Sequence, residues 1–213
     1  MNDPYVRQAQ QDGYRSRAAY KLLEINAKHT LLRPGARVLD LGAAPGGWAQ
    51  VAAAAVNAAG EPGARRGVVL GADLLAMDPI PHVRLLQLDF LDPEAEPTLR
   101  VALIEAGALA PDADRAEVDL VLSDMAAATT GHRQTDHMRI VALCEAAAEF
   151  ARGLLAPNGA FVAKVLQGGA EGQLLAQLKR DFRKVVHVKP PASRKDSAET
   201  YLVATGFRGE RFA

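Results

Sequence analysis

The stretch "VLDLGAAPGGWAQ", residues 38–50, decides the fold. An apolar run that holds one carboxylate, Asp40, leads into a loop with three glycines and a proline, and Trp48 then opens a helical pattern. A strand that passes through such a glycine-rich turn into a helix presents bare backbone at the strand's carboxyl end, where open α/β sheets bind ligands. The stretch therefore predicts an α/β sheet with a ligand site beyond this strand.

The rest of the chain alternates between short apolar runs and helical patterns, which predicts parallel βαβ units with helices on both faces of the sheet. The last two apolar runs have no helix between them and should pair antiparallel, as a C-terminal hairpin. We therefore predict a Rossmann-like fold with a mostly parallel seven-stranded sheet. The predicted strands are 36–42, 67–75, 83–92, 117–126, 160–169, 184–190 and 200–207, and the predicted helices are 14–30, 47–58, 94–107, 135–155 and 170–182.

Length and composition indicate one globular domain: 213 residues, of which 49% are hydrophobic and 23% charged. We divide residues 1–213 into a basic N-terminal helical segment, 1–33, and a core, 34–213. No run is long and apolar enough for a membrane span, and the polar N-terminus lacks the pattern of a secretory signal. The single cysteine, Cys144, cannot form an internal disulfide. We expect a cytoplasmic monomer that binds neither a membrane nor a metal.

The net charge of zero hides a basic–acidic–basic pattern. Residues 1–37 carry seven basic and three acidic residues, and residues 179–213 carry nine and four, so the centre is strongly acidic. Such ends are often only solvated surface. If the fold brings them together, they form a surface for a polyanion. The basic residues that we expect to contact phosphates are Arg7, Arg15, Arg17, Lys28, Lys189, Arg194 and Lys195.

Three successive predicted strands end in an acid: Asp73, Asp89 and Asp124. The glycine loop after the first predicted strand does not match the dinucleotide-binding fingerprint, because Ala44 stands where the fingerprint has its middle glycine. It also lacks the Lys-Ser/Thr of a phosphate-binding P-loop. Carboxylates suit a ligand with hydroxyls and positive charge, and S-adenosyl-L-methionine has a ribose diol, an ammonium and a sulfonium.

Each acid can be given a role toward that cofactor. Asp73 can accept bonds from both ribose hydroxyls, Asp89 can meet the adenine amino group, and Asp40 or the backbone near Gly42 can face the amino-acid end. Trp48 can form a wall, since an aromatic face tolerates a nearby cation. Taken singly, these residues are more typical of turns, helix caps and core packing; their coincidence favours the ligand site.

Lys164 is the anomaly of the predicted strand "AFVAKVLQ", whose other residues are mostly apolar. A buried ammonium is costly unless it is paired with an acid or loses its proton. In either case it is a candidate for chemistry, although a lysine at a strand end can also extend to the surface for purely structural reasons.

Several segments in order carry a resemblance to a known family: "YRSRAAYKLLEI", "VLDLGAAPGGWAQ", "LDFLD", "VLSDMA", "LLAPNGAFVAKVLQG" and "SRKDSAETYLVATGF". Over nearly the whole chain the sequence resembles the FtsJ/RrmJ-type ribosomal RNA large-subunit ribose methyltransferases. The resemblance implies an S-adenosyl-L-methionine-dependent methyltransferase fold. It also implies methylation of a uridine 2′-hydroxyl in 23S-type rRNA of the large ribosomal subunit.

The family's Lys-Asp-Lys-Glu tetrad matches Lys21, Asp124, Lys164 and Glu199, with Lys164 as the implied proton acceptor. The resemblance implies cofactor contacts at Gly46, Trp48, Asp73, Asp89 and Asp124. One departure is that the family often carries an asparagine after "SDMA", where this chain has Ala127 and Ala128. The alternatives are a tRNA 2′-O-ribose methyltransferase and a small-molecule O-methyltransferase.

Overall fold

In a computed structural model, the structure describes residues 3–108, 118–126, 130–167, 172–194 and 196–209. Ala127 and Ala128, and also Lys195, lie outside the described residues. Among the described helices, none combines the length and apolarity needed to cross a bilayer.

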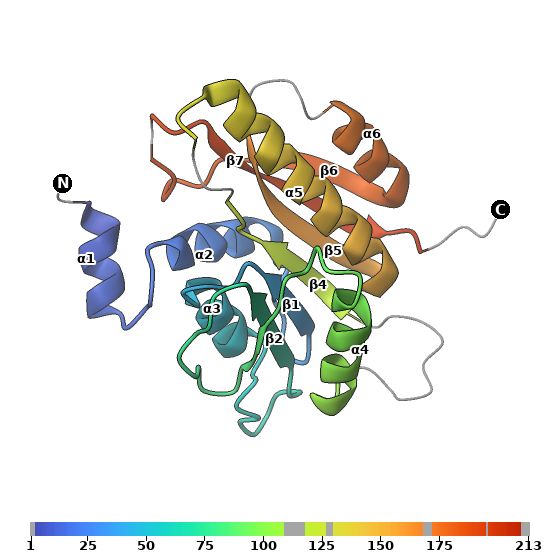
Figure 1. Cartoon of the computed structure of the whole chain (residues 1–213). Coiled ribbons are helices and arrows are strands. Elements are labelled where there is room, and N and C mark those ends of the chain that lie inside the picture. The colour runs from blue at the N-terminus through green and yellow to red at the C-terminus, as the bar shows by residue number, and fades with distance from the viewer. Residues whose placement is uncertain (1–2, 109–117, 127–129, 168–171, 195, 210–213) are drawn as a thin grey trace.

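Seven strands form one sheet in the order β3-β2-β1-β4-β5-β7-β6. The first five pair in parallel and β7 runs antiparallel to both of its neighbours, so the predicted mostly parallel sheet with a C-terminal hairpin is confirmed (Figure 1). The strands are β1 Arg37–Leu41, β2 Val68–Asp73, β3 Arg84–Gln87, β4 Val118–Ser123, β5 Leu155–Leu166, β6 Phe182–Val188 and β7 Glu199–Phe207.

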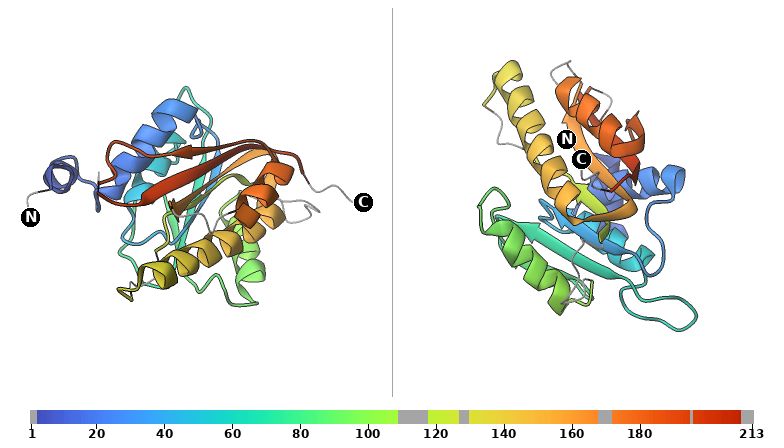
Figure 2. Two further views of the ribbon diagram at one scale, coloured as in Figure 1. Left: turned by 90° about the horizontal axis from the view of Figure 1, so that it is seen from above. Right: turned by 90° about the vertical axis from the view of Figure 1, so that its right-hand side faces the viewer.

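Helices cover both faces of the sheet, as Figures 1 and 2 show, and each face has its own apolar core. One core contains Leu99, Cys144 and Leu178 beneath α4, α5 and α6; the other contains Leu22 and Val51 from α2 and α3. The helices are α1 Pro4–Gln11, α2 Ala18–His29, α3 Gly47–Ala55, α4 Ala95–Glu105, α5 Arg133–Leu154 and α6 Gly172–Asp181.

The alternation of buried side chains along β5 determines the face of the sheet on which Lys164 lies. Phe161, Ala163 and Val165 belong to the core under α4, α5 and α6, whereas Val162 belongs to the core under α2 and α3. Because successive strand residues point to opposite faces, Lys164 projects toward the α2 side. Tyr201, which pairs with Lys164 across the antiparallel β5–β7 ladder, belongs to the same core.

The structure corrects several boundaries. Strand β3 ends at Gln87, so Asp89 lies beyond the strand and not within the predicted range 83–92. Helix α1 was not predicted; Asp3 caps it by accepting a hydrogen bond from the Tyr5 amide, and Pro4 occupies its first turn, both favourable features at a helix start. Strand β5 begins at Leu155 and includes 156–159, which we expected to be a turn after the helix. Asn158 adopts a positive φ of 68° there, so the backbone bends without leaving the strand.

Candidate active site

The carboxyl ends of three neighbouring strands bring Gly42, Asp73 and Asp124 into one row. Leu41 pairs with Ala72 on β2 and with Ser123 on β4, so the next residue of each strand continues the same register. The Gly42 amide still donates to the Ala72 carbonyl at 2.8 Å. Two of the three predicted acids therefore lie on either side of the glycine loop.

The Asp73 carboxylate binds the glycine loop directly. It accepts hydrogen bonds from the Ala44 amide at 2.9 Å and from the Leu75 amide at 2.8 Å. Carboxylate oxygens can each accept more than one bond, so Asp73 fixes the loop and keeps acceptor capacity for a ligand. Asp89 lies two residues beyond β3 and is exposed, with one oxygen accepting from the Leu91 amide at 2.9 Å.

Two glycines of the loop are required by the packing of the protein itself. Gly42 has a φ of +72°, and a Cβ there would lie 2.3 Å from the side chain of Met125. Gly46 has a φ of +113°, and its Cβ would lie 2.4 Å from Ile80. Side chains are excluded at both positions by conformation and by space, so the bare backbone is explained in part by close packing of the loop.

Trp48 lies at the start of α3 with only 3% of its surface exposed. Its indole N–H donates to the Ala18 carbonyl of α2 at 2.7 Å, and its ring packs on Tyr201 with centroids 5.6 Å apart. The ring thus ties α2 to β7 behind the strand ends. Contact between Trp48 and a cofactor stays a prediction.

The four tetrad-type residues form two ion pairs. Lys164 is 9% exposed, and its ammonium lies 3.1 Å from a carboxylate oxygen of Asp124 and donates to the same residue's carbonyl oxygen at 2.6 Å. Lys21 extends from α2, and its ammonium lies 2.6 Å from a carboxylate oxygen of Glu199 at the start of β7. Of the two alternatives for a buried Lys164, an acidic partner or loss of its proton, the structure shows the acidic partner.

Tyr201 joins the two pairs and was missed by the sequence analysis. Its hydroxyl lies 2.8 Å from a carboxylate oxygen of Asp124 and 3.1 Å from a carboxylate oxygen of Glu199, and the Lys21 ammonium lies 5.8 Å from its ring centroid. The signal in the sequence was its position two residues after Glu199 on one strand, which places both side chains on the same face. All four predicted residues therefore lie in one connected cluster.

The cluster is electrostatically coupled. Burial alone would raise the pKa of Glu199, but Lys21 and then Lys164 outweigh it, and the net pKa is lowered. Burial raises the pKa of Tyr201 well above its ordinary value, and the charges of Asp124 and Glu199 raise it further. Glu199 is thus held as the carboxylate and Tyr201 as the neutral phenol, which can donate a hydrogen bond to a carboxylate.

Asp40 is an unpaired buried acid beside this row. It is fully buried, and among the described residues neither carboxylate oxygen has a hydrogen-bond partner. Burial raises its pKa well above the ordinary value, and the charges of Asp124 and Asp73 add to the effect. Three neighbouring carboxyl groups, one of them without a hydrogen-bond partner among the described residues, suit a cationic ligand. The sulfonium and ammonium of S-adenosyl-L-methionine fit this requirement.

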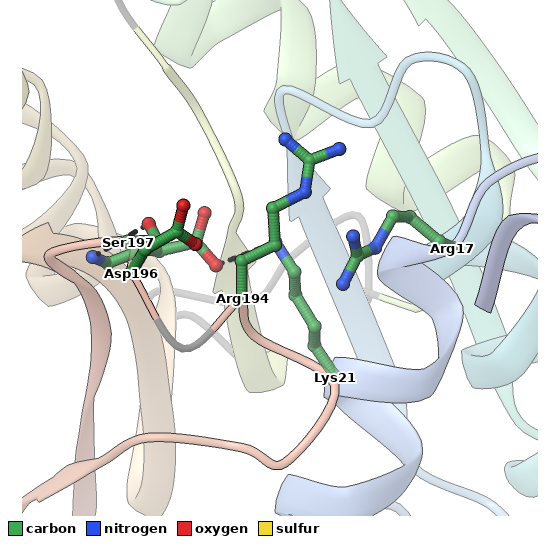
Figure 3. Close-up of a pocket in the computed structure, with 6 residues that line it drawn as sticks. Arg17, Lys21, Arg194, Asp196 and Ser197 are labelled. Carbon is green, nitrogen blue, oxygen red and sulfur yellow. Dashed lines mark hydrogen bonds and ion pairs between the residues drawn. The ribbon is translucent and has the colours of Figure 1, made fainter. Parts of the chain in front are cut away.

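A pocket of about 270 Å³ opens beside the cluster (Figure 3). Lys21 and Glu199 contribute to its wall. Arg17, the residue before α2, and Arg194, in the loop before β7, also line it. Arg17 also pairs with Asp3 and donates to the Ala192 carbonyl. The two basic ends of the chain therefore meet at this pocket.

Arg15 has a different place from the one expected. Its guanidinium donates to the carbonyl oxygens of Asp78 and Pro79, each at 2.7 Å, and to that of Pro45 at 3.4 Å. It fastens the glycine loop to the segment after β2. Among the other expected phosphate contacts, Arg7 and Lys28 are exposed, and Lys189 donates to the Ser197 carbonyl at 2.7 Å.

Known proteins resemble this chain over almost its full length. Three curated relatives carry the name "Ribosomal RNA large subunit methyltransferase E". The protein from Parvibaculum lavamentivorans is 57% identical, covering 98% of this chain and 79% of the relative. The protein from Azorhizobium caulinodans is 56% identical, covering 98% of this chain and 81% of the relative. The protein from Roseobacter denitrificans is 54% identical, covering 99% of this chain and 83% of the relative.

A solved structure and a family model agree with these relatives. The crystal structure of a ribosomal RNA methyltransferase from Plasmodium falciparum superposes with a TM-score of 0.77 at 30% identity, covering 92% of this chain and 100% of that one. The model of the FtsJ-like methyltransferases matches residues 14–207, which include the glycine loop and every member of the buried cluster. The chain belongs to the FtsJ-like methyltransferase family.

Proposed function

We propose that the protein transfers a methyl group from S-adenosyl-L-methionine to the ribose 2′-hydroxyl of a uridine in 23S-type large-subunit rRNA. The observation that carries the proposal is the buried cluster in which Tyr201 joins the Lys164–Asp124 pair to the Lys21–Glu199 pair. It lies beside an acidic row at the ligand-binding edge of the sheet. The names of relatives that are 54–57% identical support an rRNA substrate.

The cofactor supplies an electrophilic methyl group. The residues that would hold it belong to the acidic row and the adjoining loops: Gly46, Trp48, Asp73, Asp89 and Asp124. Asp73 would accept from the ribose hydroxyls while still anchoring the Ala44 amide. Asp40 would act as a counter-charge to the cationic end, since a cation nearby favours its ionised form.

The residues of the cluster have separable roles in the proposed reaction. Alignment of acceptor oxygen and methyl group provides the largest part of the acceleration. Lys164 would accept the hydroxyl proton once its ammonium has released a proton to solvent, and Asp124 would fix the position of its side-chain nitrogen. Lys21, held by Glu199, would bind the acceptor nucleotide from the pocket side, where its ammonium reaches the wall.

The pocket supports an RNA rather than a small-molecule substrate. Arg17, Lys21 and Arg194 surround it, and among the described residues that line it only Asp196 and Glu199 are acidic. Guanidinium groups bind phosphate oxygens well and carry no base preference. RNA binding should therefore weaken steeply with salt. We further propose that the chain acts as a cytoplasmic monomer on the assembled large subunit and forms one domain over 1–213.

Methyl incorporation distinguishes the candidate substrates. Large ribosomal subunits and bulk tRNA are purified from a strain that lacks the protein and incubated with labelled cofactor. We expect label in a single ribose of the large-subunit RNA and none in tRNA, and no label in subunits from the parent strain, whose site is already methylated. Label in tRNA alone would contradict the proposed substrate, and transfer to neither RNA would favour a small-molecule acceptor.

A further inference from the structure

A second cleft lies at the opposite edge of the sheet, where the strands begin. It has a volume of about 460 Å³, and its walls include Arg37 at the start of β1 and Asp119 near the start of β4. Asp124 follows the other end of β4, so the cleft and the active site are separated along the strand by about 17 Å. The chemistry proposed above makes no use of this cleft.

The cleft is strongly basic. Asp119 is the only carboxylate that lines it within the described part of the chain, and the Arg37 guanidinium already holds this group at 3.0 Å. Arg33 and Arg65 also line the cleft and are exposed, and neither forms an ion pair with a described carboxylate. Two guanidinium groups thus line the cleft without an ion pair to any carboxylate in the described part of the chain.

His29, at the end of α2, lines the cleft and lies near two further cations, Lys28 and Lys184, which are not among the described lining residues. Its pKa is lowered first by burial and then by the charges of Lys28 and Lys184. Lys184 is exposed on β6 and pairs across the ladder with Thr205, which lines the cleft. Cations therefore lie around the cleft at the end of α2, in the turn before β1, in the loop before β2 and on the edge strand β6.

The lining indicates the class of ligand. Among the described residues of the cleft there is no phenylalanine, tyrosine or tryptophan on which a base could stack. Forked guanidinium donors match phosphate oxygens, and phosphate contacts position a nucleic acid without reading its sequence. We propose that this cleft, defined by His29, Arg33 and Arg65, binds phosphate groups of the RNA substrate as a second anchor remote from the reaction.

The proposal rests on the proposed function, since it assumes that the ligand is the RNA to be methylated. An RNA held at both sites must run around the edge of the sheet across several nucleotides. A long or folded substrate can do this, whereas a short hairpin that carries only the target loop cannot. The anchor would therefore contribute to binding of the natural substrate and not to the chemical step.

The test uses the double variant R33Q/R65Q. The Arg65 stem lies against Gly35, where a Cβ would come within 2.6 Å of the arginine Cδ; glutamine keeps a carbon at the β, γ and δ positions and removes the charged guanidinium group. The matched control, K179Q/R180Q, removes two exposed cations from α6 on the other face of the sheet. Affinity for full-length large-subunit rRNA is measured at several salt concentrations, and the rate of methyl transfer is measured on a short hairpin.

We expect R33Q/R65Q to bind the long RNA about tenfold more weakly at low salt, with a log–log salt slope smaller by about 1.5, since each lost phosphate contact contributes about 0.7–0.9. Its rate on the hairpin should equal wild type, and the control should bind like wild type. Unchanged RNA affinity of R33Q/R65Q would overturn the proposal. An equal loss of affinity in K179Q/R180Q would also overturn it, because the effect would then depend only on the net charge of the protein.

Two further outcomes separate this inference from the others. Unchanged RNA binding, together with a shift of the His29 ring signals by inorganic phosphate, would assign the cleft to a free anion and overturn its assignment to RNA. The binding assay does not require methyl transfer. A wild-type protein that binds the long RNA with the expected slope and methylates neither RNA would therefore contradict the proposed function alone.

Discussion

The Lys164 ammonium lies 3.1 Å from the Asp124 carboxylate and 2.6 Å from the carbonyl oxygen of the same residue. Asp124 directly follows β4 and Lys164 lies on β5, so the parallel pairing of two core strands fixes the geometry. Loss of one partner leaves a buried charge without its counter-ion, which is strongly destabilising. Substitutions at this pair therefore need a measurement of stability beside the measurement of rate.

Lys164→Ala should abolish methyl transfer while cofactor affinity stays near that of wild type. A general base typically contributes at least about 10²-fold, and the cofactor contacts proposed above do not include this lysine. Methyl transfer to large subunits and calorimetric titration with the cofactor give the two readouts, with thermal unfolding as the check on folding. Lys179→Ala, on the surface of α6, is the control. Methyl transfer by Lys164→Ala at the wild-type rate would contradict the role of Lys164 as proton acceptor.

Tyr201→Phe should lower the rate of methyl transfer about tenfold, because the bridge between Asp124 and Glu199 is lost while the ring still packs on Trp48. Losing a hydrogen bond to a charged group also costs about 1.5–3 kcal/mol of unfolding free energy.

Tyr20→Phe provides a matched control for this substitution. It removes a comparable hydroxyl bond, from Tyr20 to the Asp12 carboxylate at 2.6 Å, in the small cluster between α1 and α2. Both variants should lose stability in urea titrations, and only Tyr201→Phe should lose rate. Equal rates in the two variants would show that Tyr201 only supports the fold.

The fold was readable from the sequence where local pattern and burial agree. Apolar runs such as 118–123 are buried on both faces, and their type and approximate ends follow from composition alone. Helix α1 was missed because it is short and mostly polar: only Tyr5, Val6 and Ala9 give it an apolar side, and Asp3 and Pro4 mark its start. The insertion of β7 between β5 and β6 is a property of the whole sheet, which local pattern does not encode.

The site was readable only in part for a similar reason. Carboxylates at strand ends could be placed at one edge because parallel strands share that edge. That Lys21 on α2 reaches Glu199, and that Tyr201 bridges two carboxylates, depends on how a helix packs on the sheet. Arg15 shows a contact that charge alone does not predict: its guanidinium donates to backbone carbonyl oxygens, while its contact with phosphate stays a prediction.

Asp40 should make folding less favourable as pH rises. The unfolded chain ionises this residue near pH 4, whereas burial and then Asp124 and Asp73 raise its pKa in the folded protein. Below pH 4 the buried Asp40 costs no unfolding free energy through this titration. Above pH 4 the free energy of unfolding falls by up to about 1.4 kcal/mol per pH unit, until the pH exceeds the pKa of Asp40 in the folded protein. Asp40→Asn removes this titration and leaves the other groups in place.

Urea unfolding of wild type and Asp40→Asn at pH 5 and pH 8 isolates the effect. We expect the variant to gain stability relative to wild type between the two pH values, whatever constant offset the buried amide adds. A difference that does not change with pH would mean that Asp40 titrates alike in the folded and unfolded states. The same variant should bind the cationic cofactor more weakly, because the counter-charge is gone.

Asp89 and Asp92 form a natural pair for testing the cofactor site. Both are exposed, and each accepts a hydrogen bond from the amide two residues ahead, Leu91 at 2.9 Å and Glu94 at 2.8 Å. Replacing either by alanine removes one turn bond and one negative charge. Asp89 lies nearer to β3, two residues after Gln87 and directly after Leu88, whose amide donates to the Asp73 carbonyl at 2.8 Å.

Asp89→Ala should therefore weaken cofactor binding about tenfold, as expected for loss of a hydrogen bond to a charged acceptor. Asp92→Ala should leave cofactor binding unchanged. Calorimetric titration of the two variants measures both affinities, and equal affinities would remove Asp89 from the cofactor site while leaving Asp73 and Asp124 in it.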